Sequence, residues 1–254
     1  MGVYRESLKK RRAVEFMSDR VYRPLAHLLV RALLRTRVRP EHLVLLQGAL
    51  GALAAGLVVR GDDLAAAALL IARSVLDNAD GQLARARGQA SQLGRYLDTE
   101  VDLLTNLLVF LALGARTGGW GRAAAGFFLL VLILSADYAL NSPKTLPRER
   151  GPEPWAGWLE AFYRRFFGPQ DEFFARRFSR GAPGWYRTLL ANLGLSTQHT
   201  ALALSLAVHR PELYLDGVFL AFALSLLGYL YLVCVSRTPS PPSPPSPGSR
   251  ADGS

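Results

Sequence analysis

Apolar residues along the chain fall in long runs, without the alternation of apolar and polar positions that marks a half-buried strand. Such runs predict helices that cross a membrane, because about 20 apolar residues are needed to span a hydrocarbon core of about 30 Å. We expect six spans, the second and fifth of them short, at residues 43–59, 63–79, 95–115, 122–141, 195–209 and 212–235. The predicted fold class is an all-α integral membrane protein.

Residues 18–36 show a different, amphipathic pattern. One helical face would carry Val21, Leu25, Leu28, Leu29, Ala32 and Leu33, and the other Arg20, Arg23, His27, Arg31 and Arg35. A helix of this kind can lie at the headgroup boundary, where its arginines attract anionic lipids. We therefore expect an N-terminal interfacial amphipathic helix before the spans. The alternative is an ordinary amphipathic helix packed on the domain, since both have the same periodicity.

The chain divides into three parts by composition. Residues 1–42 form a cytoplasmic amphipathic segment, residues 43–235 a six-helix transmembrane domain with a cytoplasmic loop at 142–194, and residues 236–254 a tail with six prolines. The loop is rich in aromatic residues, which gather at membrane interfaces, so we expect one or two surface helices in it. The tail is expected to be disordered.

The net charge of +10 follows membrane topology rather than a nucleic-acid surface. Residues 1–42 hold eleven Lys and Arg and residues 142–194 hold nine, whereas the connections on the opposite side hold only Arg60, Arg116, Arg122 and Arg210. The positive-inside rule then places both termini and the loop in the cytoplasm. The connection between the second and third spans falls on the same side, and no nucleic-acid partner is expected.

Four carboxylates follow the second span at fixed spacing. Asp77 and Asp80 are three residues apart and Asp98 and Asp102 four apart, so each pair shares one face of a helix. A carboxylate at membrane depth is costly unless it faces water, pairs with a cation or binds a metal. Two facing pairs would suit Mg²⁺ or Mn²⁺, which take oxygen ligands, and the absence of a His/Cys cluster in the sequence argues against zinc.

Small and basic residues lie between the two acid pairs. Gly81 and Ala84 would leave room for a nucleotide against the helix, and Gly94 would give clearance one turn before Asp98. Arg85 lies one turn after Gly81 and can bind a phosphate through its forked donors. The alternative is a solvated charged loop whose acids pair with nearby arginines, namely Arg73, Arg85, Arg87 and Arg95.

Together these residues form a specific pattern. Written in full it is Asp77-x2-Asp80-Gly81-x2-Ala84-Arg85-x8-Gly94-x3-Asp98-x3-Asp102, which resembles the signature of the CDP-alcohol phosphotransferase (phosphatidyltransferase) family. The resemblance implies a membrane enzyme of phospholipid synthesis. Such an enzyme transfers a phosphoalcohol group from a CDP-alcohol to an alcohol acceptor, and CMP leaves.

The resemblance also implies roles for the matched residues. Two divalent ions, Mg²⁺ or Mn²⁺, would be held by the four acids, Asp77, Asp80, Asp98 and Asp102. Asp102 would accept the acceptor's proton, with Asp98 beside it in the catalytic pair. The CDP group would lie against Asp80, Gly81, Ala84, Arg85 and Gly94. Expected partners are a CDP-alcohol donor, either CDP-diacylglycerol or a CDP-linked headgroup, an alcohol acceptor and membrane lipids, and a homodimer is left open.

Two departures from the family pattern bear on the substrates. Many members carry Pro-Asn-x-x-Thr before the first span, whereas this chain has Pro40-Glu41-His42-Leu43-Val44. Members that use phosphorylated acceptors tend to have a basic residue after the last aspartate, and here it is Leu103. We therefore expect an acceptor without a phosphate, either a lipid alcohol or a neutral polyol. The arginines of 142–194 leave the opposite answer open.

Two other functions fit part of the pattern. A membrane cation transporter would line a conduction path with acids, but a path needs polar residues at several depths, whereas these acids cluster near one membrane face. A non-catalytic lipid-binding scaffold would tolerate the loss of an aspartate, and all four are present. The phosphotransferase remains the favoured function.

Overall fold

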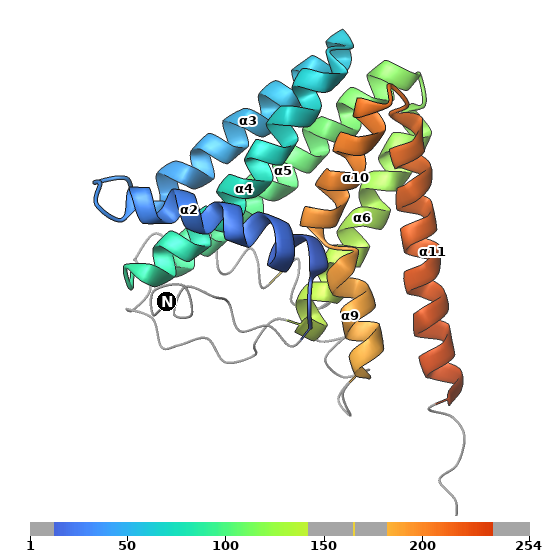
Figure 1. The fold of residues 1–254 in the computed structure, drawn as a ribbon. Coiled ribbons are helices and arrows are strands. Elements are labelled where there is room, and N and C mark those ends of the chain that lie inside the picture. Colours follow the sequence, from blue (N-terminus) through green and yellow to red (C-terminus); the bar gives the residue numbers. More distant parts are fainter. Residues whose placement is uncertain (1–12, 142–164, 166–181, 236–254) are drawn as a thin grey trace, which may run out of the picture.

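The computed structural model describes residues 13–141, 165 and 182–235, and every regular element in these ranges is a helix (Figure 1). This confirms the all-α class. The elements are η1 (Ser18–Tyr22), α2 (Arg23–Leu33), α3 (Pro40–Arg60), α4 (Asp63–Ala86), α5 (Gln92–Thr117), α6 (Trp120–Asn141), α9 (Gly184–Asn192), α10 (Leu195–Ala207) and α11 (Glu212–Val235). The aromatic stretches of 142–194 in which surface helices were expected, and the tail 236–254, lie outside the described residues.

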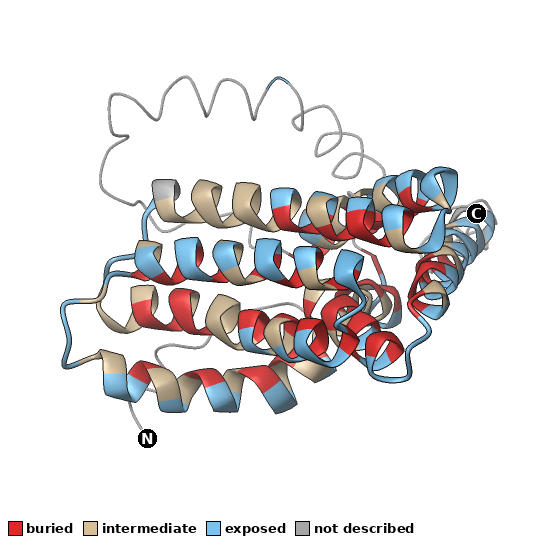
Figure 2. Cartoon of the chain, turned by 90° about the horizontal axis from the view of Figure 1, so that it is seen from above, coloured by how far each residue is buried: buried red, intermediate tan, exposed pale blue. Residues whose placement is uncertain are grey.

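The helices form a bundle around α3, α4 and α5. Helix α3 packs against both α4 and α5, α10 packs on α4, and α6 lies between α5 and α11, while α2 crosses α4 instead of running with the bundle (Figure 1). Buried residues face the neighbouring helices and exposed ones face outward (Figure 2). This arrangement places the second half of α4 beside the first half of α5.

The main apolar core fills the half of the bundle nearest the α3–α4 turn. Its members come from six helices and include Val58, Leu70, Leu113, Leu206 and Leu215, these five fully buried. Burying one such side chain contributes roughly 1.5–3 kcal/mol to folding. The acid-bearing turns of α4 and α5 lie beyond this core, toward α2, so the polar groups begin where the apolar packing ends.

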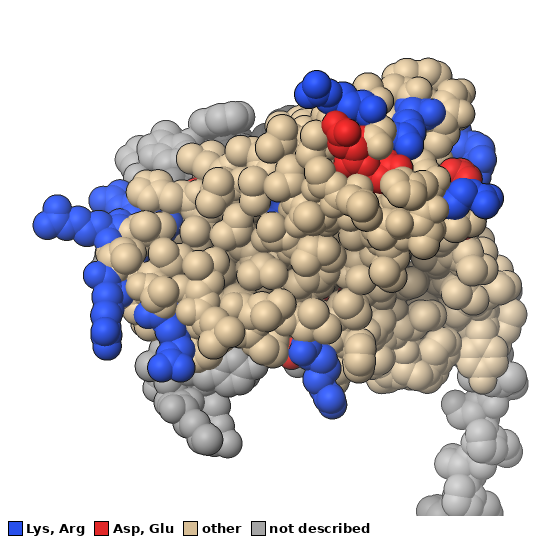
Figure 3. Space-filling view, turned by 45° about the horizontal axis from the view of Figure 1, so that its top comes forward, with Lys and Arg blue, Asp and Glu red and all other residues tan. Residues whose placement is uncertain are grey.

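Opposite charges pair at the end of the bundle where α3 meets α4. Asp63 is buried and contacts Arg116 Nη2 at 3.1 Å and His209 Nδ1 at 2.8 Å, and exposed pairs join Arg122 to Asp216 and Arg210 to Glu212. Figure 3 shows acidic and basic side chains side by side on the surface of this end. Exposed arginines without this mixture of acids follow α2 and its loop to α3, at Arg31, Arg35, Arg37 and Arg39. The charge asymmetry expected from the sequence is therefore present in the fold.

Within the described ranges, three helices are long and apolar enough to cross a membrane, judged by length and composition. They are Pro40–Arg60 of α3, Trp120–Tyr138 of α6 and Glu212–Leu232 of α11, with mean hydropathies of 1.9, 1.5 and 1.8. The other predicted spans coincide with α4, α5 and α10. Helices α4 and α5 carry the polar site, and the 13 residues of α10 extend only about 20 Å at 1.5 Å per residue. The six-span count therefore remains a prediction.

The N-terminal helix is present with a face that differs from the expected one. Its first turn is the π-helical η1, and Tyr22, Ala26 and Val30 pack inward, whereas Leu25 and Leu28 are exposed. The reason is that η1 and α2 together have two apolar surfaces, one with Tyr22, Ala26 and Val30 that fits the bundle and one with leucines that faces outward. One side of the helix therefore packs on the domain, and its location at a membrane interface remains a prediction.

Candidate active site

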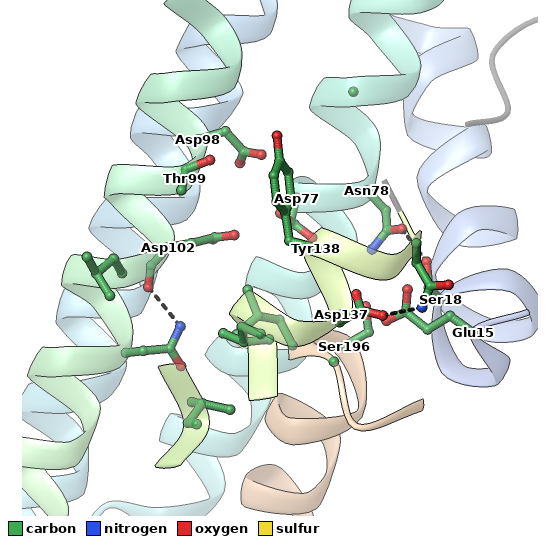
Figure 4. A pocket seen from close by; sticks show the side chains of 18 of the residues that line it. Glu15, Ser18, Asp77, Asn78, Asp98, Thr99, Asp102, Asp137, Tyr138 and Ser196 are labelled. Atoms are coloured by element: carbon green, nitrogen blue, oxygen red, sulfur yellow. Dashed lines mark hydrogen bonds between the residues drawn. The ribbon is translucent and has the colours of Figure 1, made fainter. Parts of the chain in front are cut away.

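The four aspartates come together between α4 and α5. Asp77 and Asp80 occupy successive turns of α4, and Asp98 and Asp102 successive turns of α5. One carboxylate oxygen from each of Asp77, Asp98 and Asp102 lies within 4.8 Å of the others. In Figure 4 Asp98 and Asp102 project from α5 toward Asp77. The two predicted faces therefore do face each other.

The fourth aspartate is held by a residue that the motif does not contain. Asp80 is 5% exposed, and Gln47 of α3 is completely buried beside it. Gln47 Nε2 donates to Asp98 Oδ1 at 3.0 Å and lies 3.4 Å from Asp80 Oδ2, so one amide links the two acid-bearing helices. Sequence reasoning missed this residue, although a lone glutamine in the apolar run 43–59 was a usable signal.

Close packing of α3 on α5 brings Gln47 within reach. A Cβ on Gly48 would lie 2.8 Å from Val101 Cγ1, and a Cβ on Gly51 would lie 2.2 Å from Thr105 Cγ2. Both distances are shorter than van der Waals contact, so larger residues at these two positions would push α5 away. The two glycines therefore determine how closely α5, which carries Asp98 and Asp102, approaches α3.

A cavity of about 340 Å³ opens over the acids. All four aspartates line it, together with Gly81 and Arg85. A Cβ on Gly81 would lie 3.0 Å from Arg85 Nη1, so the glycine leaves room for this guanidinium to fold back beside the acids. Of the residues that the sequence predicted for the site, these six are brought together.

Ala84 and Gly94 do not line this cavity. The backbone N–H of Gly94 donates to Ser91 Oγ at 3.0 Å, which caps the start of α5. A Cβ on Gly94 would lie 3.1 Å from Ser91 Oγ, a tight contact that the glycine avoids at the start of α5. Their contact with a nucleotide remains a prediction.

The rest of the cavity has an apolar wall and a polar end. The apolar wall comes from α5 and α6. It is formed by Leu103, Phe127, Leu130, Val131 and Leu134. The polar end includes Glu15, Ser18, Asn78 and Asp137 (Figure 4). Ser18 Oγ donates to Asn78 Oδ1 at 2.9 Å, which ties the N-terminal segment to α4. Neither α6 nor the N-terminal segment was assigned to the site from sequence.

The N-terminal segment reaches the cavity because α9 anchors it. Asn192 accepts from the N–H of Phe16 at 2.8 Å and donates to the carbonyl of Val14 at 2.9 Å. Further along, Tyr22 Oη and Thr200 Oγ1 are 2.6 Å apart, which joins η1 to α10. Residues more than 170 positions apart in the sequence thus close one side of the cavity.

The arrangement rules out a solvated charged loop. Asp77, Asp80, Asp98 and Asp102 all lie within helices, and none is exposed. Arg87 donates to backbone carbonyls at the end of α2 and in the following loop instead of pairing with these acids. Arg73, one of the arginines that the alternative invoked, forms an ion pair with Asp102. One cation is thus already present behind the cluster.

The acid cluster fits a divalent cation by its donor chemistry. Carboxylates repel one another when they are gathered at short range and partly withdrawn from water, and the four acids outnumber Arg73 and Arg85, the two arginines beside them. Oxygen donors of this kind suit Mg²⁺ and Mn²⁺. Asp77, Asp98 and Asp102 offer the converging oxygens, and Asp80 lies next to them. The residues present therefore fit the metals that the sequence pattern implied.

Fold and site together define a helical protein with apolar spans and a carboxylate cluster in a cavity. Residues 37–157 match the family model of the CDP-alcohol phosphatidyltransferases. The match confirms the resemblance found in the motif. Three apolar helices and a membrane-associated family indicate a membrane protein.

Two curated relatives match parts of the chain. A protein of Rubrobacter xylanophilus named "Bifunctional IPC transferase and DIPP synthase" is 37% identical over 106 residues, which are 42% of this chain and 24% of that protein. The "Inner membrane protein YnjF" of Escherichia coli is 33% identical over 132 residues, 48% of this chain and 64% of that protein. The chain thus spans less than two thirds of either relative.

Proposed function

We propose that this protein is a membrane enzyme that transfers a substituted phosphate group from a CDP-alcohol to an alcohol acceptor, with release of CMP, in phospholipid synthesis. The observation that carries the proposal is the cluster of Asp77, Asp98 and Asp102 oxygens within 4.8 Å, in a cavity inside the family-matched segment. The word "transferase" in the name of the Rubrobacter relative supports the same reaction class.

The roles of the acids follow from their positions. Asp77, Asp80 and Asp98 would hold two divalent cations, with Asp102 completing the set. When bound, such cations neutralise the charge of a pyrophosphate and orient it for in-line displacement. The side-chain amide of Gln47 contacts both Asp80 and Asp98 and so holds the two carboxylates in fixed positions relative to each other. The cluster is thus preorganised by its protein neighbours.

The bond changes require a proton acceptor and a place for the leaving group. The acceptor's oxygen forms a bond to the β-phosphorus, the bond from that phosphorus to the bridging oxygen breaks, and CMP departs with the bridging oxygen. The proton of the acceptor hydroxyl passes to Asp102, which lines the cavity. Arg85, folded over Gly81, is placed to bind a donor phosphate.

CMP release tests the proposal directly. Purified protein is incubated with CDP-diacylglycerol, CDP-choline or CDP-ethanolamine, each combined with a lipid alcohol, a polyol or a phosphorylated polyol. We expect CMP to appear with at least one donor and to require an acceptor. Asp216→Asn serves as the matched acid control, since Asp216 is 63% exposed at the far end of the bundle. Absence of CMP from every combination would reject the proposal.

The acceptor is expected to carry no phosphate. Among the described residues that line the cavity, the cations are Arg23 and Arg85, and Arg23 is paired with Asp19. Leu103 and the α6 wall are apolar, and a phosphate without a partner is costly to desolvate. In the panel above, diacylglycerol or a free polyol should outcompete glycerol 3-phosphate and inositol phosphate. Turnover with phosphorylated acceptors alone would assign their pocket to the loop 142–194.

The site is proposed to open to the cytoplasm. The positive-inside rule and the paired charges at the α3–α4 end support this orientation. In a Cys234→Ser background, Gln89→Cys in the α4–α5 loop should be protected from an impermeant thiol reagent on intact cells. Thr117→Cys at the end of α5 should be labelled. Both residues are exposed in the fold, so the reverse result means inverted topology.

A further inference from the structure

Arg73 is a buried cation directly behind the acid cluster. It lies on α4 one turn before Asp77 and is 1% exposed. Its Nη2 forms an ion pair with Asp102 Oδ1, and its Nη1 lies 3.1 Å from His199 Nδ1 on α10. Arginine can only donate, so the facing ring nitrogen of His199 accepts. Three helices thus meet at one guanidinium.

The fold makes room for this side chain at a specific place. A Cβ on Gly51 of α3 would lie 3.2 Å from Arg73 Nε, in addition to its collision with Thr105. His199 is itself buried, and its Nδ1 lies 3.3 Å from Ser74 Oγ, which donates to the carbonyl of Leu70. The guanidinium is therefore held from the side opposite to the cavity.

We propose that Arg73 is a positioning residue for Asp102 and that His199 holds Arg73 in place. This rests on the proposed function, in which Asp102 completes the metal cage and accepts a proton. Arg73 pairs with Oδ1 of Asp102, and Asp102 lines the cavity from α5. The Nδ2 group of Asn106 donates to the backbone carbonyl of Asp102 at 2.7 Å, so the residue is held at both its main chain and its side chain.

The competing explanation is a purely structural ion pair that joins helices. The chain offers a matched control for it in Arg116, which also bridges helices by pairing with a buried aspartate, Asp63, at the other end of the bundle. A structural role predicts the same result for both arginines, namely lower thermal stability with normal turnover by the folded fraction. A positioning role predicts a difference between them.

The experiment compares Arg73→Met, Arg73→Lys and Arg116→Met in the full-length protein. Arg73→Met should lower kcat by roughly 10–100-fold, the usual effect of removing a residue that orients a metal ligand. At saturating Mn²⁺ the donor KM should stay within about threefold of wild type, because Arg73 does not line the cavity. Arg73→Lys should recover part of kcat, and Arg116→Met should keep it while losing thermal stability.

His199 provides a second test. His199→Leu should lower kcat less than Arg73→Met does, and the double variant should lose no more than Arg73→Met alone, because both act through one contact. The proposal is overturned if Arg73→Met keeps wild-type kcat. It is also overturned if the fold-loss of kcat in the double variant equals the product of the losses in the two single variants.

Mn²⁺ binding separates this proposal from the proposed reaction. Titration of the purified protein with Mn²⁺ should show weaker binding for Arg73→Met than for wild type and unchanged binding for Arg116→Met. This comparison stands even if no CDP-alcohol yields CMP, in which case only the reaction is rejected. Equal affinities in all three proteins, or no Mn²⁺ binding by wild type, would overturn the positioning role.

Discussion

Excess EDTA should abolish CMP release, and Mg²⁺ or Mn²⁺ added beyond the chelator should restore it. Three carboxylates within 4.8 Å, with Asp80 beside them, carry more negative charge than Arg73 can balance. The pyrophosphate of a donor adds further negative charge. Divalent cations contribute several kcal/mol to the stabilisation of such a transition state, so the expected loss is on the order of 10³-fold or more.

The metal prediction has an internal check in thermal stability. Because like charges gather in the cluster, Mg²⁺ or Mn²⁺ should raise the melting temperature of wild type, since a ligand that binds only the folded state stabilises it. Asp77→Asn should weaken this effect, whereas Asp216→Asn should leave it intact. Unchanged CMP release in excess EDTA would contradict the prediction, whatever the melting temperatures show.

The sequence predicted the helices well because their signal is local. The predicted span 43–59 lies inside α3 (Pro40–Arg60), and the span 122–141 coincides with α6 but for two residues at its start. Pro40 at the first turn and Gly61 in the left-handed region mark the two ends of α3, as expected for helix start and stop signals. Length and capping residues are properties of the sequence, so they could be read without the fold.

The acid pairs were also predictable, since spacing on a helix decides which residues share a face. What spacing could not give was the set of neighbours from other helices. Gln47, Arg73 and His199 come from α3, α4 and α10, and their contacts depend on the approach of α3 to α5 and of α10 to α4. Isolated polar residues in apolar runs were the available signal. The contacts that they make across helices could not be predicted from that signal.

The face of α2 shows a limit of periodicity. A helical pattern tells which residues share a side but not which side meets protein, and α2 has Ala26, Val30 and Ala32 between its leucines. In the fold Ala26 and Val30 fit against α4, while Leu28 faces outward. Small residues allow close approach between helices, and that preference decided the contact.

Replacing single acids should separate binding from chemistry. Asp102→Asn keeps the size of the side chain and an oxygen that can still accept from Arg73, but it removes the proton acceptor. We expect kcat to fall by about 10²–10⁴-fold, the usual contribution of general base catalysis. The donor should still bind, as measured by displacement of a labelled CDP-alcohol.

Asp77→Asn should behave differently, because Asp77 contributes one of the three converging oxygens without pairing to Arg73. Loss of a cation ligand weakens the metal and with it the pyrophosphate, so affinities for Mn²⁺ and for the donor should fall together. Asp216→Asn controls for the removal of an acid as such. Equal loss of donor affinity in Asp77→Asn and Asp102→Asn would mean that all four acids serve one purpose, holding the metals, and that the proton leaves by another route.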